Sequence, residues 1–150
     1  MRVVIQRVKQ ASVSVQGAKI SEIQKGLLIL LGVETQDNQQ DIDWLVTKVA
    51  KLRIFEDSLG AMNVSIQDIG AEVIVVSQFT LHASTKKGNR PSFAKAAKPE
   101  VAIPLYQGFI DGLQTQLNKK IQTGQFGAMM EVALVNDGPV TITIDTKNKE

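Results

Sequence analysis

The strongest candidates for chemistry in the sequence are three polar residues in the middle of the chain, Ser77, Gln78 and Thr80. The four residues before them, 73–76, are apolar and mostly β-branched, which predicts a strand covered on both faces. Two hydroxyls and an amide at the end of such a strand need hydrogen-bond partners. The pattern alone leaves two interpretations open: a binding surface, or the commoner hydrogen-bonded anchor, because Ser and Thr often form turns.

Few other side chains could act as acids, bases or metal ligands. The chain has one histidine and no cysteine, which excludes disulfides and thiolate metal sites and leaves only scattered carboxylates as metal ligands. That histidine, His82, lies close to Ser77, but the sequence has no G-x-S-x-G nucleophile elbow. We therefore expect an exposed loop histidine rather than a member of a catalytic triad.

An enzyme built from this sequence would depend on backbone donors, hydroxyls, positioned water and groups of its substrate. Backbone N–H groups at the turn after a strand can stabilise an oxyanion, and one such donor contributes roughly 3 kcal/mol in acyl transfer. The sequence also lacks a glycine-rich phosphate loop. We expect neither a metal nor an organic cofactor.

A basic segment follows the polar residues, from His82 to Lys98. It contains Lys86, Lys87 and Arg90 among glycine, asparagine and proline and has almost no periodicity, which predicts a surface loop. Two interpretations of its charge stay open: a solvated connection, or a loop that contacts nucleic-acid phosphates.

Length and composition indicate one globular domain over residues 1–150. The chain is 43% hydrophobic and 21% charged, and its net charge of +2 is spread along the sequence, which disfavours broad coating of nucleic acid. The start of the chain lacks the pattern of a secretory signal, and the longest apolar run, Leu27–Leu31, is too short for a membrane helix. We therefore expect a cytoplasmic protein without membrane association, which the lack of cysteine also fits.

The hydrophobic pattern predicts a mixture of strands and helices. Apolar spacings of three and four predict helices over about 38–51, with Asp37 and Gln40 as a capping box, and over 102–117. The turn at 136–139 would ordinarily connect a hairpin, although Pro139 lacks a backbone donor. A loose tail is expected at 146–150. The predicted strands are 2–8, 12–16, 20–23, 26–33, one from Glu72, 130–134 and 140–144.

Three motifs together carry a resemblance to a known family: Ser77-Gln78-Phe79-Thr80-Leu81, Lys87-Gly88-Asn89-Arg90-Pro91-Ser92-Phe93 and Asn136-Asp137-Gly138-Pro139-Val140-Thr141. From Met1 to Asp145, the sequence resembles the D-aminoacyl-tRNA deacylases. The resemblance implies an α+β fold with two β-sheets and two principal helices in β/β/α layers. It also implies a homodimer with active sites at the interface. Its substrates would be D-aminoacyl-tRNA and alanine tRNA mischarged with glycine, both cleaved at the ester.

The resemblance further implies how the ester would be cleaved. The turn from Ser77 to Thr80 would surround the ester, and the Phe79 N–H would receive the developing negative charge. The 2′-hydroxyl of the tRNA would help to activate water, and Thr80 would position groups rather than form an acyl-enzyme. Lys86, Lys87 and Arg90 would contact tRNA phosphates.

The third motif would provide chiral selection. Gly138 and Pro139, joined by a cis peptide bond, would enter the partner's site and bar an L side chain. Arg7 would hold their loop in place; the alternative for Arg7 is a surface charge on a strand. Two rival functions remain: a non-catalytic RNA-binding module, and a small-ester hydrolase with Ser77 or Thr80 as nucleophile.

Overall fold

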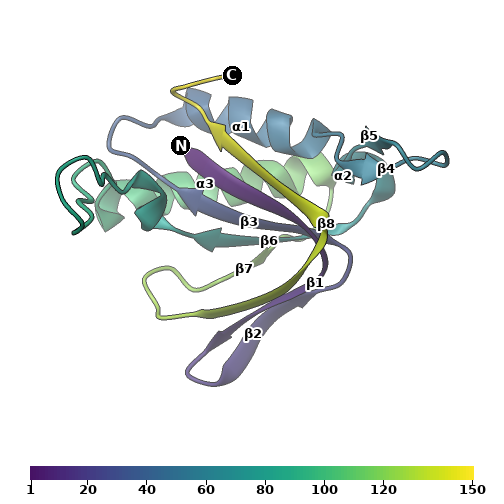
Figure 1. The fold of residues 1–150 in the computed structure, drawn as a ribbon, viewed down its shortest axis with the longest axis horizontal. Helices are drawn as coiled ribbons and strands as arrows, with labels where there is room; N and C mark the ends of the chain where they lie inside the picture. The colour runs from purple at the N-terminus through teal and green to yellow at the C-terminus, as the bar shows by residue number, and fades with distance from the viewer.

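The chain folds into a bent β-sheet that is covered on one face by two long helices (Figure 1). The computed structural model describes residues 1–150, and none of its helices has the length and apolar character needed to cross a membrane. The elements in chain order are β1 (Arg2–Val15), β2 (Ala18–Ile23), β3 (Gly26–Gly32), α1 (Gln39–Lys51), β4 (Phe55–Glu56), β5 (Met62–Val64), α2 (Ile66–Ile69), β6 (Glu72–Ser77), the 3₁₀ helix η1 (Phe79–His82), α3 (Pro99–Leu117), β7 (Gln122–Thr123) and β8 (Glu131–Asp145).

Six strands form the main sheet in the order β2-β1-β3-β6-β7, with β8 paired to β1. The pairs β3–β6 and β6–β7 are parallel, and the other pairs are antiparallel. The long strands β1 and β8 bend, so that β2 and the beginning of β8 form a second layer on the side of β3 and β6 away from the helices (Figure 1). With the separate two-stranded sheet of β4 and β5, this arrangement confirms the predicted α+β fold class.

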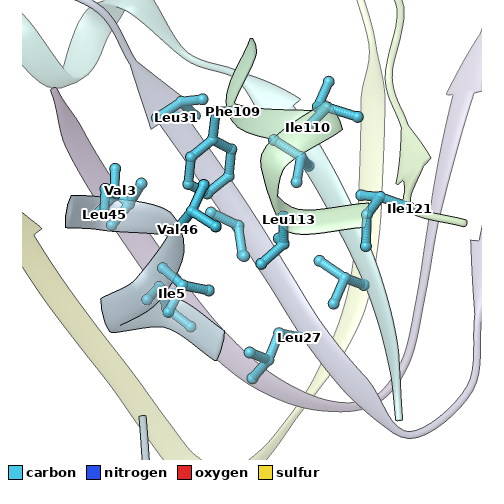
Figure 2. Packing of buried hydrophobic residues seen from close by; sticks show 14 of the residues in the cluster. Val3, Ile5, Leu27, Leu31, Leu45, Val46, Phe109, Ile110, Leu113 and Ile121 are labelled. Atoms are coloured by element: carbon cyan, nitrogen blue, oxygen red, sulfur yellow. The ribbon is translucent and has the colours of Figure 1, made fainter. Parts of the chain in front are cut away.

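Two apolar clusters fill the spaces between these layers and explain the unbroken apolar runs of β3 and β6. On the helix side, Leu31 of β3 packs with Val46 of α1 and Phe109 of α3 (Figure 2). On the other side, Leu28 of β3 and Ile74 of β6 pack against the bent parts of β1, β2 and β8. The strand through residues 73–76 is therefore buried on both faces, as predicted.

The helix predicted over 38–51 is α1, but its cap differs from the prediction. Asn38 is the N-cap: its side chain accepts a hydrogen bond from the Gln40 N–H, and the Asp41 carboxylate accepts one from the Asn38 N–H. Asp37 is instead buried, and its carboxylate accepts a hydrogen bond from the Met1 amino group at 2.5 Å. Asp37 and Gln40 therefore do not form the predicted capping box.

Two pairs of predicted strands are continuous in the structure. Residues 2–8 and most of 12–16 lie in β1, and both C-terminal strands lie in β8, because β1 and β8 pair along nearly their whole lengths. No hairpin forms at 136–139. Between the pairs Gln6–Thr141 and Val8–Asn136, four residues of β8 face one residue of β1, so residues 137–140 form a bulge, here called the Gly-Pro bulge.

The last residues are held more firmly than predicted. Thr146 is buried, and its hydroxyl accepts a hydrogen bond from the Met1 amino group at 2.7 Å. Lys147 Nζ donates to the Asp41 carboxylate at 2.8 Å. Burial would raise the pKa of Asp41, but hydrogen bonds from Lys147 and Thr146 outweigh it and lower that pKa to about 2. The prediction of a loose tail is therefore wrong for Thr146 and Lys147.

Candidate active site

The predicted polar residues form one turn at the end of β6. Ser77 is the last residue of the strand, the Gln78 N–H donates to the Leu31 carbonyl at 2.8 Å, and η1 begins at Phe79. Ser77 and Gln78 are half-buried, whereas Phe79 and Thr80 are exposed. The fold thus places all four residues together with an open outer side, and we call residues 77–80 the polar turn.

The polar turn offers main-chain donors rather than a side-chain base. Phe79 and Thr80 open η1, so their N–H groups have no carbonyl partner within that helix. The Gln78 side-chain amide donates to Thr80 Oγ1, and neither ring nitrogen of His82 has a hydrogen-bond partner. The turn is therefore suited to stabilising an oxyanion with backbone N–H groups, and no base is hydrogen-bonded to the Thr80 hydroxyl.

Two residues that the sequence analysis missed hold the polar turn against the sheet. A Cβ atom at Gly32 would lie 2.9 Å from the Gln78 carbonyl oxygen, so only glycine lets the turn lie this close to the end of β3. Arg2 Nη1 donates to the Leu81 carbonyl at 3.0 Å, and Arg2 Nε donates to Asp145 at 2.7 Å. The only indication of this contact in the sequence was a glycine directly after the apolar run Leu27–Leu31.

His82 corrects one expectation from the sequence. It is 2% exposed rather than an exposed loop residue. Its Nδ1 lies 4.0 Å from a carboxylate oxygen of Glu34. Because the imidazole is not hydrogen-bonded to Ser77 or Thr80, the structure assembles no serine triad.

A basic loop over residues 84–92 leaves the polar turn and returns to it. Its ends are joined by two backbone hydrogen bonds between Ser84 and Ser92, at 2.8 and 2.9 Å. Just after the loop, the Phe93 ring meets the Phe79 ring edge to face, with centroids 5.1 Å apart. The loop contains the predicted tRNA-binding residues Lys86, Lys87 and Arg90, and all three are exposed.

The remaining predicted residues meet at the Gly-Pro bulge. Arg7 is 6% exposed, so its interpretation as a surface charge is wrong. Its Nη1 donates to the Ile54 carbonyl at 2.7 Å and its Nε to the Asp137 carbonyl at 3.1 Å. Gly138 and Pro139 are joined by a cis peptide bond, and both are exposed at the tip of the bulge.

The polar turn and the Gly-Pro bulge lie far apart in one chain. Gly32, next to the polar turn, pairs with Arg2, whereas the bulge lies opposite Arg7, five residues further along β1. At about 3.3 Å per strand residue this separation is about 17 Å. One chain therefore does not bring Gly138 and Pro139 to its own polar turn.

Comparison with known proteins gives a consistent result. The family model described as D-Tyr-tRNA(Tyr) deacylase matches residues 4–145. A protein named D-aminoacyl-tRNA deacylase from Flavobacterium psychrophilum is 65% identical over 150 residues, with 100% of both chains covered. A protein of the same name from Bacteroides thetaiotaomicron is 61% identical over the same length, with 100% of both chains covered.

Two solved structures share the fold. The c-Myc DNA Unwinding Element Binding Protein superposes with a TM-score of 0.92 and 41% identity, covering 97% of this chain and 98% of its own. A structure described as a probable eukaryotic D-amino acid tRNA deacylase superposes with a TM-score of 0.83. That second match covers 95% of this chain and 97% of the other at 15% identity, and it bears on the fold alone.

Proposed function

The chain belongs to the D-Tyr-tRNA(Tyr) deacylase family, a family of hydrolases that act on D-aminoacyl-tRNA, and we propose that its polar turn cleaves the ester by main-chain oxyanion stabilisation. The observation that carries this proposal is the pair of N–H groups at the start of η1, on an exposed turn without a side-chain base. A turn of this kind stabilises charge that develops on a carbonyl oxygen.

The reaction is an attack by water on the ester carbonyl. A bond forms from the water oxygen to the carbonyl carbon, and the carbonyl oxygen takes the negative charge beside the Phe79 N–H. The tetrahedral intermediate then expels the ribose oxygen, which takes up the proton given up by the attacking water, and the products are a free D-amino acid and tRNA. The substrate's 2′-hydroxyl orients the water, and Thr80, held by Gln78, positions the reacting groups.

Chiral selection comes from a second copy of the chain. Gly138 and Pro139 are exposed on the bulge in the middle of β8, and the 17 Å estimated between the bulge and the chain's own polar turn supports a site completed by the partner of a homodimer. Buried Arg7 donates a hydrogen bond to the Asp137 carbonyl, which keeps the backbone carbonyls of the bulge in a fixed position.

Selection by rejection has two consequences for substrate range. An L side chain collides with the carbonyls of Gly138 and Pro139, whereas a D side chain points away from them, so the enzyme accepts D side chains of many sizes. Glycine has no side chain to reject, so glycine mischarged on alanine tRNA is also removed.

The basic loop supplies the contacts to tRNA. Lys86, Lys87 and Arg90 are exposed on a loop whose base adjoins the polar turn through the pair of Phe79 and Phe93. This placement favours contacts between the three cations and phosphates near the aminoacylated 3′ end of the tRNA.

Mixed dimers test the division of labour between the two chains. One chain carries Phe79→Pro, which removes the oxyanion donor, and the other carries Pro139→Gly, which opens the bulge. In a mixed dimer, the Pro139→Gly chain has the one active polar turn, and the Phe79→Pro chain provides the intact bulge that enters it. L-tyrosyl-tRNA is therefore not hydrolysed by the mixed dimer, whereas Pro139→Gly homodimers hydrolyse it. If the mixed dimer hydrolyses the L ester as fast per active polar turn as the Pro139→Gly homodimer does, the bulge acts within its own chain and the proposal is wrong.

A further inference from the structure

The only histidine of the chain is buried beside the polar turn without a hydrogen-bond partner. His82 is 2% exposed, and neither Nδ1 nor Nε2 has a hydrogen-bond partner. Leaving a buried polar group unpaired is unfavourable, so a position of this kind needs a compensating interaction. The reaction described above does not use this imidazole.

Glu34 is the nearest group that could provide that interaction. One carboxylate oxygen of Glu34 lies 4.0 Å from His82 Nδ1, and the Glu34 side chain is 17% exposed. The Glu34 backbone is fixed on both sides: its N–H donates to the buried Asp37 carboxylate at 2.7 Å, and it forms a β-bridge with Ala96. Glu34 therefore connects η1 with the segment that follows the basic loop.

Arg2, a charged residue that contacts η1, is already paired. Arg2 binds the Leu81 carbonyl and the Asp145 carboxylate. Gly32 allows close packing on the remaining side, because a Cβ atom there would lie 3.0 Å from His82 Cδ2. The imidazole is thus closely packed against β3, with Glu34 as its unpaired polar neighbour.

We propose that His82 is a positioning residue whose Nδ1–H donates to the Glu34 carboxylate when substrate occupies the polar turn. The step shortens the 4.0 Å separation by about 1 Å, to the length of a hydrogen bond. It draws η1 toward the connection after β3 and fixes the Phe79 N–H in the position that the oxyanion needs. The inference rests on the proposed deacylase reaction and adds to it a device for holding the turn.

Substitutions separate this role from general packing. His82→Leu removes the donor and is expected to lower kcat for D-tyrosyl-tRNA about tenfold while KM stays within a factor of two, since the turn but not the tRNA contact is affected. His82→Asn places an amide N–H close to the position of Nδ1–H and restores most of kcat, whereas His82→Gln does not. Glu34→Leu gives the same loss, and the double variant loses no more than either single variant.

Unchanged kcat in His82→Leu overturns the proposal, and so do additive losses in the double variant. A second measurement uses wild-type protein and does not depend on activity. Because His82 is the only histidine, the imidazole resonances in ¹⁵N NMR belong to it alone. Adding a non-hydrolysable D-aminoacyl ester analogue is expected to reveal an Nδ1–H resonance that exchanges slowly with solvent and is lost in Glu34→Leu. If the saturated complex lacks that resonance, the hydrogen bond between His82 and Glu34 is rejected, even if the deacylase reaction is confirmed. If wild-type protein does not hydrolyse the D ester, the deacylase reaction itself is rejected.

Discussion

Replacing Phe79 by proline tests the main-chain oxyanion donor directly. Proline removes the N–H at the first position of η1 and leaves the carbonyl in place. The site tolerates this residue because the first helical position suits proline, and Gln78 before it has φ −144° and ψ 81°, outside the helical region that proline disfavours in its predecessor. Phe79→Ala is the matched control, since it removes the same ring contact with Phe93 but keeps the N–H.

The size of the effect follows from the value of one oxyanion donor. Loss of such a donor lowers kcat by about 10² to 10³, which corresponds to roughly 3 to 4 kcal/mol of transition-state stabilisation. Single-turnover hydrolysis of D-tyrosyl-tRNA is expected to slow by this factor in Phe79→Pro and by less than tenfold in Phe79→Ala. Thermal unfolding of both variants checks that they remain folded. Equal rates for the two variants would refute the oxyanion role of this N–H.

Three further predictions concern the supports of the site. Arg7→Met leaves the buried Ile54 carbonyl without a donor, so we expect the free energy of unfolding to fall by about 3 kcal/mol and Tm to fall by roughly 6 to 12 °C. Lys9→Met, at an exposed position, is the control and should change Tm little. Equal Tm values for the two variants would contradict the burial of Arg7. Lys147→Met removes a hydrogen bond that lowers the pKa of Asp41. A lowered carboxyl pKa stabilises the fold above about pH 4 and loses its effect toward pH 2. Because Lys147 is partly exposed and is one of several causes of the shift, urea unfolding should show a deficit of at most about 1 kcal/mol at pH 7 that disappears near pH 2. Neutralising the three cations of the basic loop should weaken tRNA binding and reduce its salt slope by about 2 to 3. Neutralising three exposed lysines outside that loop, Lys48 and Lys51 of α1 and Lys120 after α3, should leave the slope unchanged.

The parts of the fold that follow local rules could be predicted from the sequence. The apolar run at 73–76 is buried on both faces because sheet and helices cover opposite sides of β6. The two long helices follow from spacings of three and four apolar residues. The four residues of the polar turn are consecutive, so locating the end of one strand was enough to place them together.

The parts that depend on distant segments could not be predicted in this way. The motif around Gly138 has the composition of a turn, but β8 continues past it as one strand because β1 provides a partner along nearly the whole of β8. The burial of His82 depends on its packing against Gly32, fifty positions earlier in the chain. Likewise Thr146 is ordered by the amino group of Met1 at the other end of the sequence. Local pattern carries no information on such contacts.

The most direct test of the account compares one tRNA charged with D-tyrosine and with L-tyrosine. Purified protein is incubated with each ester in the presence of a chelator, and the rates of ester loss are measured. Rapid loss of the D ester with the L ester intact is the predicted result. Equal cleavage of both esters would contradict rejection by Gly138 and Pro139, and tRNA binding without cleavage of either ester would show a non-catalytic RNA-binding module.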